Sequence, residues 1–203
     1  HANGSPNGLG NEMILFNVPG FEDSADPPVI KITKGLPKIT DPALFDGTYQ
    51  IGPRRVILDG AGVAGDGLTF PTTGSVVSGL IVKGFTGHGV RIEDEGGNFF
   101  KNNTFQSNGK AGLSISNAPN NTFDNNQFLD NTEQGVLIEG AQSDRNLLRR
   151  GNTISGNKVG LEIRDAPNNV LTGSSVVSSK GDGVVIEGNS ATGNSISGSR
   201  IGA

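Results

Sequence analysis

The chain has 203 residues, of which 33% are hydrophobic and 32 are glycine, and its formal net charge is −4. This acidic balance argues against nucleic-acid binding, which usually relies on a basic patch, and no apolar run approaches the roughly 20 residues of a membrane-spanning helix. Because the chain contains no cysteine, disulfides and thiolate-metal sites are excluded.

The first part of the chain changes from a polar segment to a series of short apolar runs. Residues 1–12 are rich in Gly, Asn and Pro, which predicts a flexible N-terminal arm. Five strand-length runs follow, at residues 13–18, 29–32, 36–39, 43–47 and 56–60. We expect one β domain over 13–203, with the first rungs in 13–60 and regular repeats in 61–203.

The regular part is built on one short motif: a glycine, an aliphatic residue, a variable residue and a large apolar residue. It occurs six times, with glycines 22 to 25 residues apart at positions 67, 89, 112, 135, 160 and 183. Such spacing is typical of a solenoid, whose repeats bury a core only by stacking on one another. Alternation along a strand places the two apolar residues of each motif inside. The predicted core is Val90, Ile92, Leu113, Ile115, Val136, Ile138, Leu161, Ile163, Val184 and Ile186.

Asparagine recurs at fixed places between these motifs, for example at Asn98, Asn121, Asn169 and Asn194. We interpret these positions as sharp corners, because asparagine tolerates left-handed backbone and stacked amides can bond along the axis. One repeat carries an extra residue near 149–151, which predicts a bulge there.

These motifs resemble those of right-handed parallel β-helix proteins of the pectate-lyase-like superfamily. Near the N-terminus, Phe16-Asn17-Val18-Pro19-Gly20 and Phe45-Asp46-Gly47-Thr48 are similar to the first rungs of secreted bacterial β-helix proteins. The resemblance implies an all-β, single-stranded right-handed parallel β-helix with rungs of about 22–25 residues, located outside the cell or at its surface. It leaves function open, because this superfamily contains lyases, hydrolases, epimerases and non-catalytic surface proteins.

Enzymes of this superfamily place calcium-binding carboxylates and a basic residue on the outward face near the glycine-marked strand. The candidates at that place are Arg91, Glu93, Asp94, Arg164 and Asp165. However, the outward column as a whole is mixed, because it reads Thr69, Arg91, Ser114, Leu137, Glu162 and Val185. No convergent set of carboxylates with a base is therefore evident.

Two metal sites can be considered. The cluster of Glu93, Asp94 and Glu95 has the ligands that calcium prefers, although an acidic, solvated corner explains it more simply. His1 and His88 could together hold copper, but a leading histidine is also a common tag remnant, and His88 is most simply a corner residue. We therefore expect no bound cofactor.

Three functions remain open. We favour an extracellular structural or surface-assembly solenoid, non-catalytic, that associates head to tail with its own copies and contacts polysaccharide. Head-to-tail association is expected because neither end of the sequence contains a recognisable cap. The alternatives are a polysaccharide lyase or epimerase, and a fragment of a longer β-helix protein.

Overall fold

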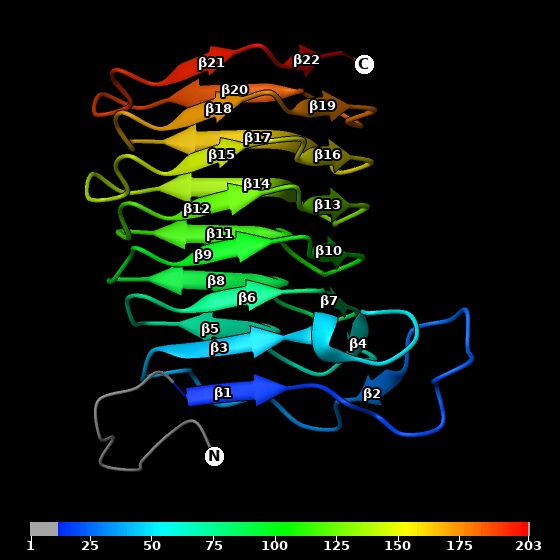
Figure 1. The fold of residues 1–203 in the computed structure, drawn as a ribbon. Coiled ribbons are helices and arrows are strands. Elements are labelled where there is room, and N and C mark those ends of the chain that lie inside the picture. The colour runs from blue at the N-terminus through cyan, green and yellow to red at the C-terminus, as the bar shows by residue number, and fades with distance from the viewer. Residues whose placement is uncertain (1–11, 203) are drawn as a thin grey trace.

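The computed structural model describes residues 12–202, which form a tube of three parallel sheets (Figure 1). The predicted arm at residues 1–12 lies outside the described residues except for Glu12, which begins the first strand. The only helical segment in 12–202 is the single 3-10 turn η1, Gly47–Tyr49. The all-β prediction is confirmed for this part of the chain.

Successive strands of each sheet come from successive rungs, with eight strands in sheets A and B and six in sheet C. Sheet A contains, in spatial order, β1 (Glu12–Leu15), β3 (Ala43–Asp46), β6 (Val76–Ser78), β9 (Phe99–Lys101), β12 (Thr122–Asp124), β15 (Leu147–Arg149), β18 (Val170–Thr172) and β21 (Ser195–Ser197). Sheet B contains β2 (Val29–Lys31), β4 (Val56–Asp59), β7 (Leu80–Lys83), β10 (Thr104–Gln106), β13 (Gln127–Leu129), β16 (Thr153–Ser155), β19 (Ser175–Val177) and β22 (Arg200–Ile201). Sheet C holds the glycine-marked strands β5 (Leu68–Phe70), β8 (Val90–Glu93), β11 (Leu113–Ser116), β14 (Gln134–Glu139), β17 (Val159–Arg164) and β20 (Val184–Glu187).

Equivalent residues of successive repeats pair directly. In sheet C, Leu113 pairs with Val90 on one side and with Val136 on the other, and every strand pair in the three sheets is parallel. The repeat spacing therefore predicted the register as well as the fold, because each motif copy stacks on the preceding copy. The run at 36–39 is not a strand, since Pro37 has no N–H to donate, although Ile39 N still bonds Thr69 O at 2.8 Å.

The core is a narrow apolar column inside the tube. Phe100 and Phe123 stack with ring centroids 5.2 Å apart, and Phe105 stacks on Phe128 at 5.5 Å. The predicted core residues from Val90 to Ile163 are all buried. The two predicted core residues of β20 are exceptions, with Val184 half-buried and Ile186 43% exposed, because β20 is the last strand of sheet C and no described strand covers it.

Each of these corners contains two adjacent residues: one with left-handed backbone, and a buried asparagine that follows it. The left-handed residue is the first: Asn102, for example, has φ 57°, and Asn125 has φ 52°. The buried residues that follow, Asn103 and Asn126, do not have positive φ. Our interpretation that the stacked asparagines themselves adopt the left-handed backbone was therefore wrong for these corners. At the predicted bulge, both Arg150 and Gly151 are left-handed, which accommodates the extra residue.

The buried asparagines form ladders along the axis. Asn126 Oδ1 accepts from the backbone N of Asn103 at 3.0 Å and from its Nδ2 at 3.1 Å, while Asn126 Nδ2 donates to Phe100 O at 2.9 Å. The same pattern recurs at the other two corners, through Asn98 and Asn121 and through Asn108 and Asn131. The amides thus satisfy backbone groups that the corners would otherwise leave unpaired.

Candidate functional site

The face of sheet C was expected to offer outward side chains for chemistry. The alternate residues Ser114, Leu137 and Glu162 are instead almost completely covered, with Glu162 only 6% exposed. Glu162 accepts a hydrogen bond from Gln134 Nε2 at 2.7 Å and is ion-paired with Arg164. Most side chains of this column are therefore buried against, or bonded to, their neighbours and are not available to a ligand.

The first candidate pair lies at the start of this face. Arg91 Nε donates to Glu93 Oε2 at 2.8 Å, and Lys38 Nζ bonds the other carboxylate oxygen. The hydrogen bond from Lys38 is the main reason that the pKa of Glu93 lies below its ordinary value, although partial burial opposes it. Glu93 is therefore an ionised bridge between two cations.

Arg164 is the centre of a second, separate network. Its guanidinium pairs with Glu187 at 3.1 Å, with Glu139 at 3.4 Å, and with Glu162. The hydrogen bond to Glu187 and the nearby carboxylates raise its pKa despite some burial. The register separates Arg164 from Glu93 by three rungs, or about 14 Å at the usual strand spacing, so the two candidates do not form one site.

The other acidic candidates do not converge. Asp94 and Glu95 are exposed, and Asp94 has left-handed backbone with φ 66°. Asp165 also lies at a left-handed corner, where its carboxylate accepts from Ser190 N at 3.2 Å. Within residues 12–202, no group of three or more His, Asp or Glu side chains is gathered in a way that could hold a metal ion.

His88 is a structural residue at a buried corner. Its Nδ1 accepts a hydrogen bond from Ala111 N at 3.2 Å, and its own backbone N donates to Asp66 at 2.7 Å. Burial is the main cause that lowers the pKa of His88. The copper hypothesis also required His1, which lies outside the described residues.

The basic pair in the bulged repeat, Arg149 and Arg150, is ion-paired as well. Arg149 Nε lies 2.8 Å from Asp124 Oδ1, and Arg150 Nη1 lies 3.3 Å from Asp124 Oδ2. Both cations therefore share a single carboxylate, which offsets one of their two positive charges.

The three-sheet parallel stack and the repeat register correspond to the profile of one known family. The profile described as "Right handed beta helix region" matches residues 61–202. The chain belongs to this right-handed β-helix family. The match begins where the regular repeats were predicted to begin, and it confirms the resemblance at the level of fold.

The other comparisons add nothing to this family assignment. No curated protein and no solved structure matches the chain significantly. Across the described residues of this β-helix, no helix is long and apolar enough to cross a membrane.

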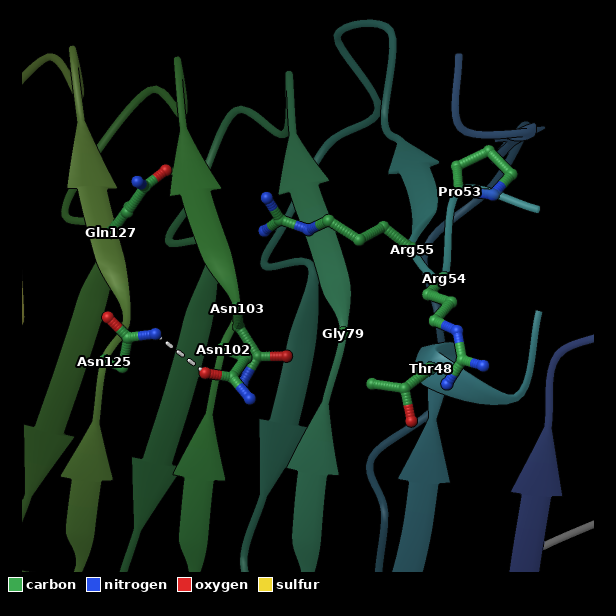
Figure 2. Close-up of a pocket in the computed structure, with 9 residues that line it drawn as sticks. All are labelled: Thr48, Pro53, Arg54, Arg55, Gly79, Asn102, Asn103, Asn125 and Gln127. Carbon is green, nitrogen blue, oxygen red and sulfur yellow. Dashed lines mark hydrogen bonds between the residues drawn. The ribbon is translucent and has the colours of Figure 1, made fainter. Parts of the chain in front are cut away.

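The β-helix has a polar hollow at the corner between sheets A and B, which sequence reasoning did not identify (Figure 2). Its volume is about 340 Å³, and its lining consists of Thr48, Pro53, Arg54, Arg55, Gly79, Asn102, Asn103, Asn125 and Gln127. A second hollow of about 280 Å³ shares Thr48 and Arg54 with it and adds Tyr49, Gln50, Ile51 and Gly52. We call the two together the corner groove.

Arg55 is the best-positioned cation of the corner groove. It directly precedes β4, and its Nη2 donates to Thr104 Oγ1 at 2.6 Å on β10, two rungs along the axis. Figure 2 shows the side chain reaching from its own rung toward that of Asn102. Its Nε is buried and has no hydrogen-bond partner, and burial lowers the pKa of Arg55.

The two arginines of this groove could be read in the sequence, but the residues that lie beside them in space could not. Arg54 and Arg55 are adjacent, and an isolated basic dipeptide in a loop is uninformative. Their association with Asn102 and Asn125 follows only from the stacking of rungs that are separated by about two and three repeats.

Proposed function

We propose that this β-helix is an extracellular or cell-surface structural solenoid that has no catalytic activity, associates head to tail and contacts polysaccharide. The observation that carries the proposal is the charge pairing on sheet C. Lys38, Arg91 and Glu93 form one closed set, and Arg164 is surrounded by three glutamates.

This pairing argues against the lyase alternative on chemical grounds. A basic residue that removes a proton from a sugar must itself be deprotonated, and catalysis favours a pKa near the working pH. The carboxylates around Arg164 raise its pKa, which stabilises the protonated form. Arg91 is likewise held by a carboxylate, Glu93, that is shared with Lys38.

Head-to-tail association is supported by the terminal strands. Ile186, Ile196 and Ile201, on β20 to β22, are 43%, 38% and 44% exposed. At the opposite end, Ile14 on β1 and Ile30 on β2, which pair with the buried Phe45 and Leu58, are only half-buried. Uncovered rungs of this kind present unpaired backbone groups beside apolar side chains, and the two unlike ends would join heterologously into a filament.

Two measurements test this proposal. Incubation with polygalacturonate or alginate in the presence of calcium should release no unsaturated ends. A rise in their absorbance that Arg91→Ala or Arg164→Ala abolished would contradict the non-catalytic assignment and would favour the lyase.

Light scattering over a range of concentrations tests the assembly. The average mass of the particles in solution should rise with protein concentration. Ile201→Lys should reduce this rise, because it places a charge at the proposed contact between copies. Thr132→Lys adds the same charge at an exposed corner in the middle of the tube and should have no effect. A monomer at every concentration would refute head-to-tail association.

A further inference from the structure

The outer face of sheet A carries an apolar stripe along the whole tube. One outward residue from each of its eight strands pairs in register with the next, so that these side chains form one column up the sheet (Figure 1). Six of the eight are apolar, and the column, which we call the apolar stripe, reads Met13, Leu44, Val76, Phe99, Thr122, Leu147, Val170 and Ser195. The two end members are exposed and the six between them are half-buried.

The side chains of the apolar stripe do not belong to the core of the tube. In each strand the next residue points inward instead, as the buried Phe100 beside Phe99 and the buried Leu148 beside Leu147 show. All strands of residues 12–202 belong to the three sheets, so no second layer of strands covers the stripe in this part of the chain. Single exposed apolar residues are ordinary, whereas a contiguous apolar surface marks an interaction site.

The other two sheets of residues 12–202 have no apolar column of this length. The equivalent column of sheet B is apolar only on its first three strands, β2, β4 and β7, and is polar from Thr104 on β10 onward. On sheet C, Arg91 and Glu162 interrupt the outward column. The apolar stripe is therefore a property of sheet A rather than of the repeat in general.

A second outward column of sheet A, beside the apolar stripe, carries balanced charges. Along the axis it contains Asp46, Lys101, Asp124 and Arg149, on β3, β9, β12 and β15. Two acids and two bases give this charged column no net charge, so two copies of it would not repel each other. Lys101 is exposed, and within residues 12–202 no carboxylate lies within 4.0 Å of its ammonium group.

A second copy of sheet A matches both columns. Its side chains repeat at the same rung spacing of about 4.8 Å, so two apolar stripes can interdigitate along their whole length, as in aligned sheet-on-sheet packing. With the tubes antiparallel, around a two-fold axis that runs along the strands between β9 and β12, all eight strands of each copy overlap. Each apolar stripe then faces the other, and each charged column faces the other.

The antiparallel arrangement sets unlike side chains against each other. Lys101 lies opposite Asp124 of the second copy, and Phe99 lies opposite the smaller Thr122. A parallel arrangement, about an axis along the stripe, would instead set Phe99 against Phe99. It would also leave the two charged columns on opposite sides of the contact, without partners. Charge and side-chain size therefore both favour the antiparallel arrangement.

We propose that two copies of this chain pack sheet A against sheet A, with their tubes antiparallel and the two-fold axis between β9 and β12. This lateral dimer goes beyond the proposed function, because it uses the side of the tube and is centred away from the exposed ends. Seven rung spacings and three residues per strand give a footprint of roughly 34 Å by 10 Å. Such a footprint is at the small end of specific interfaces, so the dimer should dissociate in the micromolar range.

Sedimentation equilibrium of the full chain carrying Ile201→Lys tests the proposal. This substitution disfavours association at the ends of the tube and leaves the outer face of sheet A unchanged. The average mass should rise with protein concentration from that of one chain to a limit of two chains. The mass of a single chain at every concentration up to about 100 µM would overturn the lateral dimer.

Further substitutions in this background locate the contact. Leu147→Lys should weaken the dimer by about tenfold or more, because an isologous contact receives the added charge twice. Leu129→Lys is the matched control, since Leu129 is a half-buried, outward leucine of sheet B, and it should leave the dimer unchanged. Lys101→Glu sets a like charge against Asp124 of the second copy and should also weaken the dimer.

Lys101 is exposed, so Lys101→Glu keeps the test decisive if Leu147→Lys fails to fold. Unchanged dimerisation in Lys101→Glu and in a folded Leu147→Lys would refute the assignment to sheet A.

Cross-linking tests the orientation of the two copies, because the chain has no cysteine of its own. In the antiparallel dimer β6 faces β15, so Val76→Cys mixed with Leu147→Cys and treated with a short bis-maleimide should give linked pairs of chains. Neither variant alone should do so, because its two cysteines lie three rungs, or about 14 Å, apart along the axis. Linked pairs from Val76→Cys alone would contradict the antiparallel arrangement.

The outcomes separate the lateral dimer from head-to-tail association. A parent chain whose mass stops at two chains, and whose dimer Leu147→Lys weakens, would keep the lateral dimer and refute head-to-tail association. Continued growth of the parent, with Ile201→Lys a strict monomer, would keep head-to-tail association and refute the lateral dimer.

Discussion

A Cβ atom on Gly135 would lie 2.7 Å from Nδ2 of Asn157, closer than carbon and nitrogen can approach without a bond between them. That amide is fixed, because Nδ2 donates to Phe128 O at 2.9 Å and to Ser155 O at 3.1 Å. Gly89 has the same relationship to Asn108, and Gly112 to Asn131. At these three positions glycine leaves room for the buried amide ladder, and none of the three has positive φ.

Substitution of Gly135 by alanine should destabilise the fold by about 1–3 kcal/mol, the usual cost of overpacking a close-packed interior. The added methyl would also approach Ile154 Cγ2 to 2.4 Å. Urea denaturation measures the change, with Gly35→Ala as control, since a Cβ there meets only Ala64 O at 3.6 Å. Equal stability of the two variants would show that the ladder can shift to make room.

The amide ladder should itself be a major source of stability. Asn126→Ala would leave the buried N–H of Asn103 without its acceptor, at a cost of about 1–3 kcal/mol. Its neighbour Asn125 is exposed and left-handed, so Asn125→Gly keeps the corner backbone and should change stability by less than about 0.5 kcal/mol. Comparable losses in both variants would mean that the corner, rather than the ladder, is the important feature.

Stability should fall as the pH drops below the ordinary histidine range because of His88. Burial lowers its folded pKa below the ordinary value of 6.5, so the unfolded chain binds the proton more readily. The stabilisation is complete above the unfolded pKa and is lost as pH falls through the folded pKa, where protonation also removes the acceptor for Ala111 N. Melting temperatures between pH 8 and pH 5 should show this dependence, and His88→Gln should flatten it. An unchanged profile in His88→Gln would assign the effect to other groups.

The predicted core can be tested directly at Ile138, which is fully buried in the middle of sheet C. Ile138→Asp would bury a carboxylate without a partner, which should cost several kcal/mol and lower the melting temperature strongly. Ile186→Asp repeats the substitution at the equivalent but exposed position of the last rung, and it should cost much less. Similar melting of Ile138→Asp and the parent would contradict the repeat assignment.

The sequence alone determined the repeat, and with it the fold, the register and most of the core. A solenoid makes this possible because each rung contacts mainly the rungs next to it, so similarity along the chain becomes proximity in space. Leu113 lies between Val90 and Val136 in the structure because each occupies the same place in its own repeat.

What each residue does within the rung was decided only by the tertiary structure. The sequence could not show that the ladder asparagines follow the left-handed residue, that Glu162 is covered by its neighbours, or that Arg164 has three acidic partners. The groove at Arg55 depends on side chains from several rungs meeting at one corner, where their reach and burial are set by packing between rungs. A repeat pattern fixes where backbones stack, whereas charge pairing and exposure depend on how the individual side chains fill the space between them.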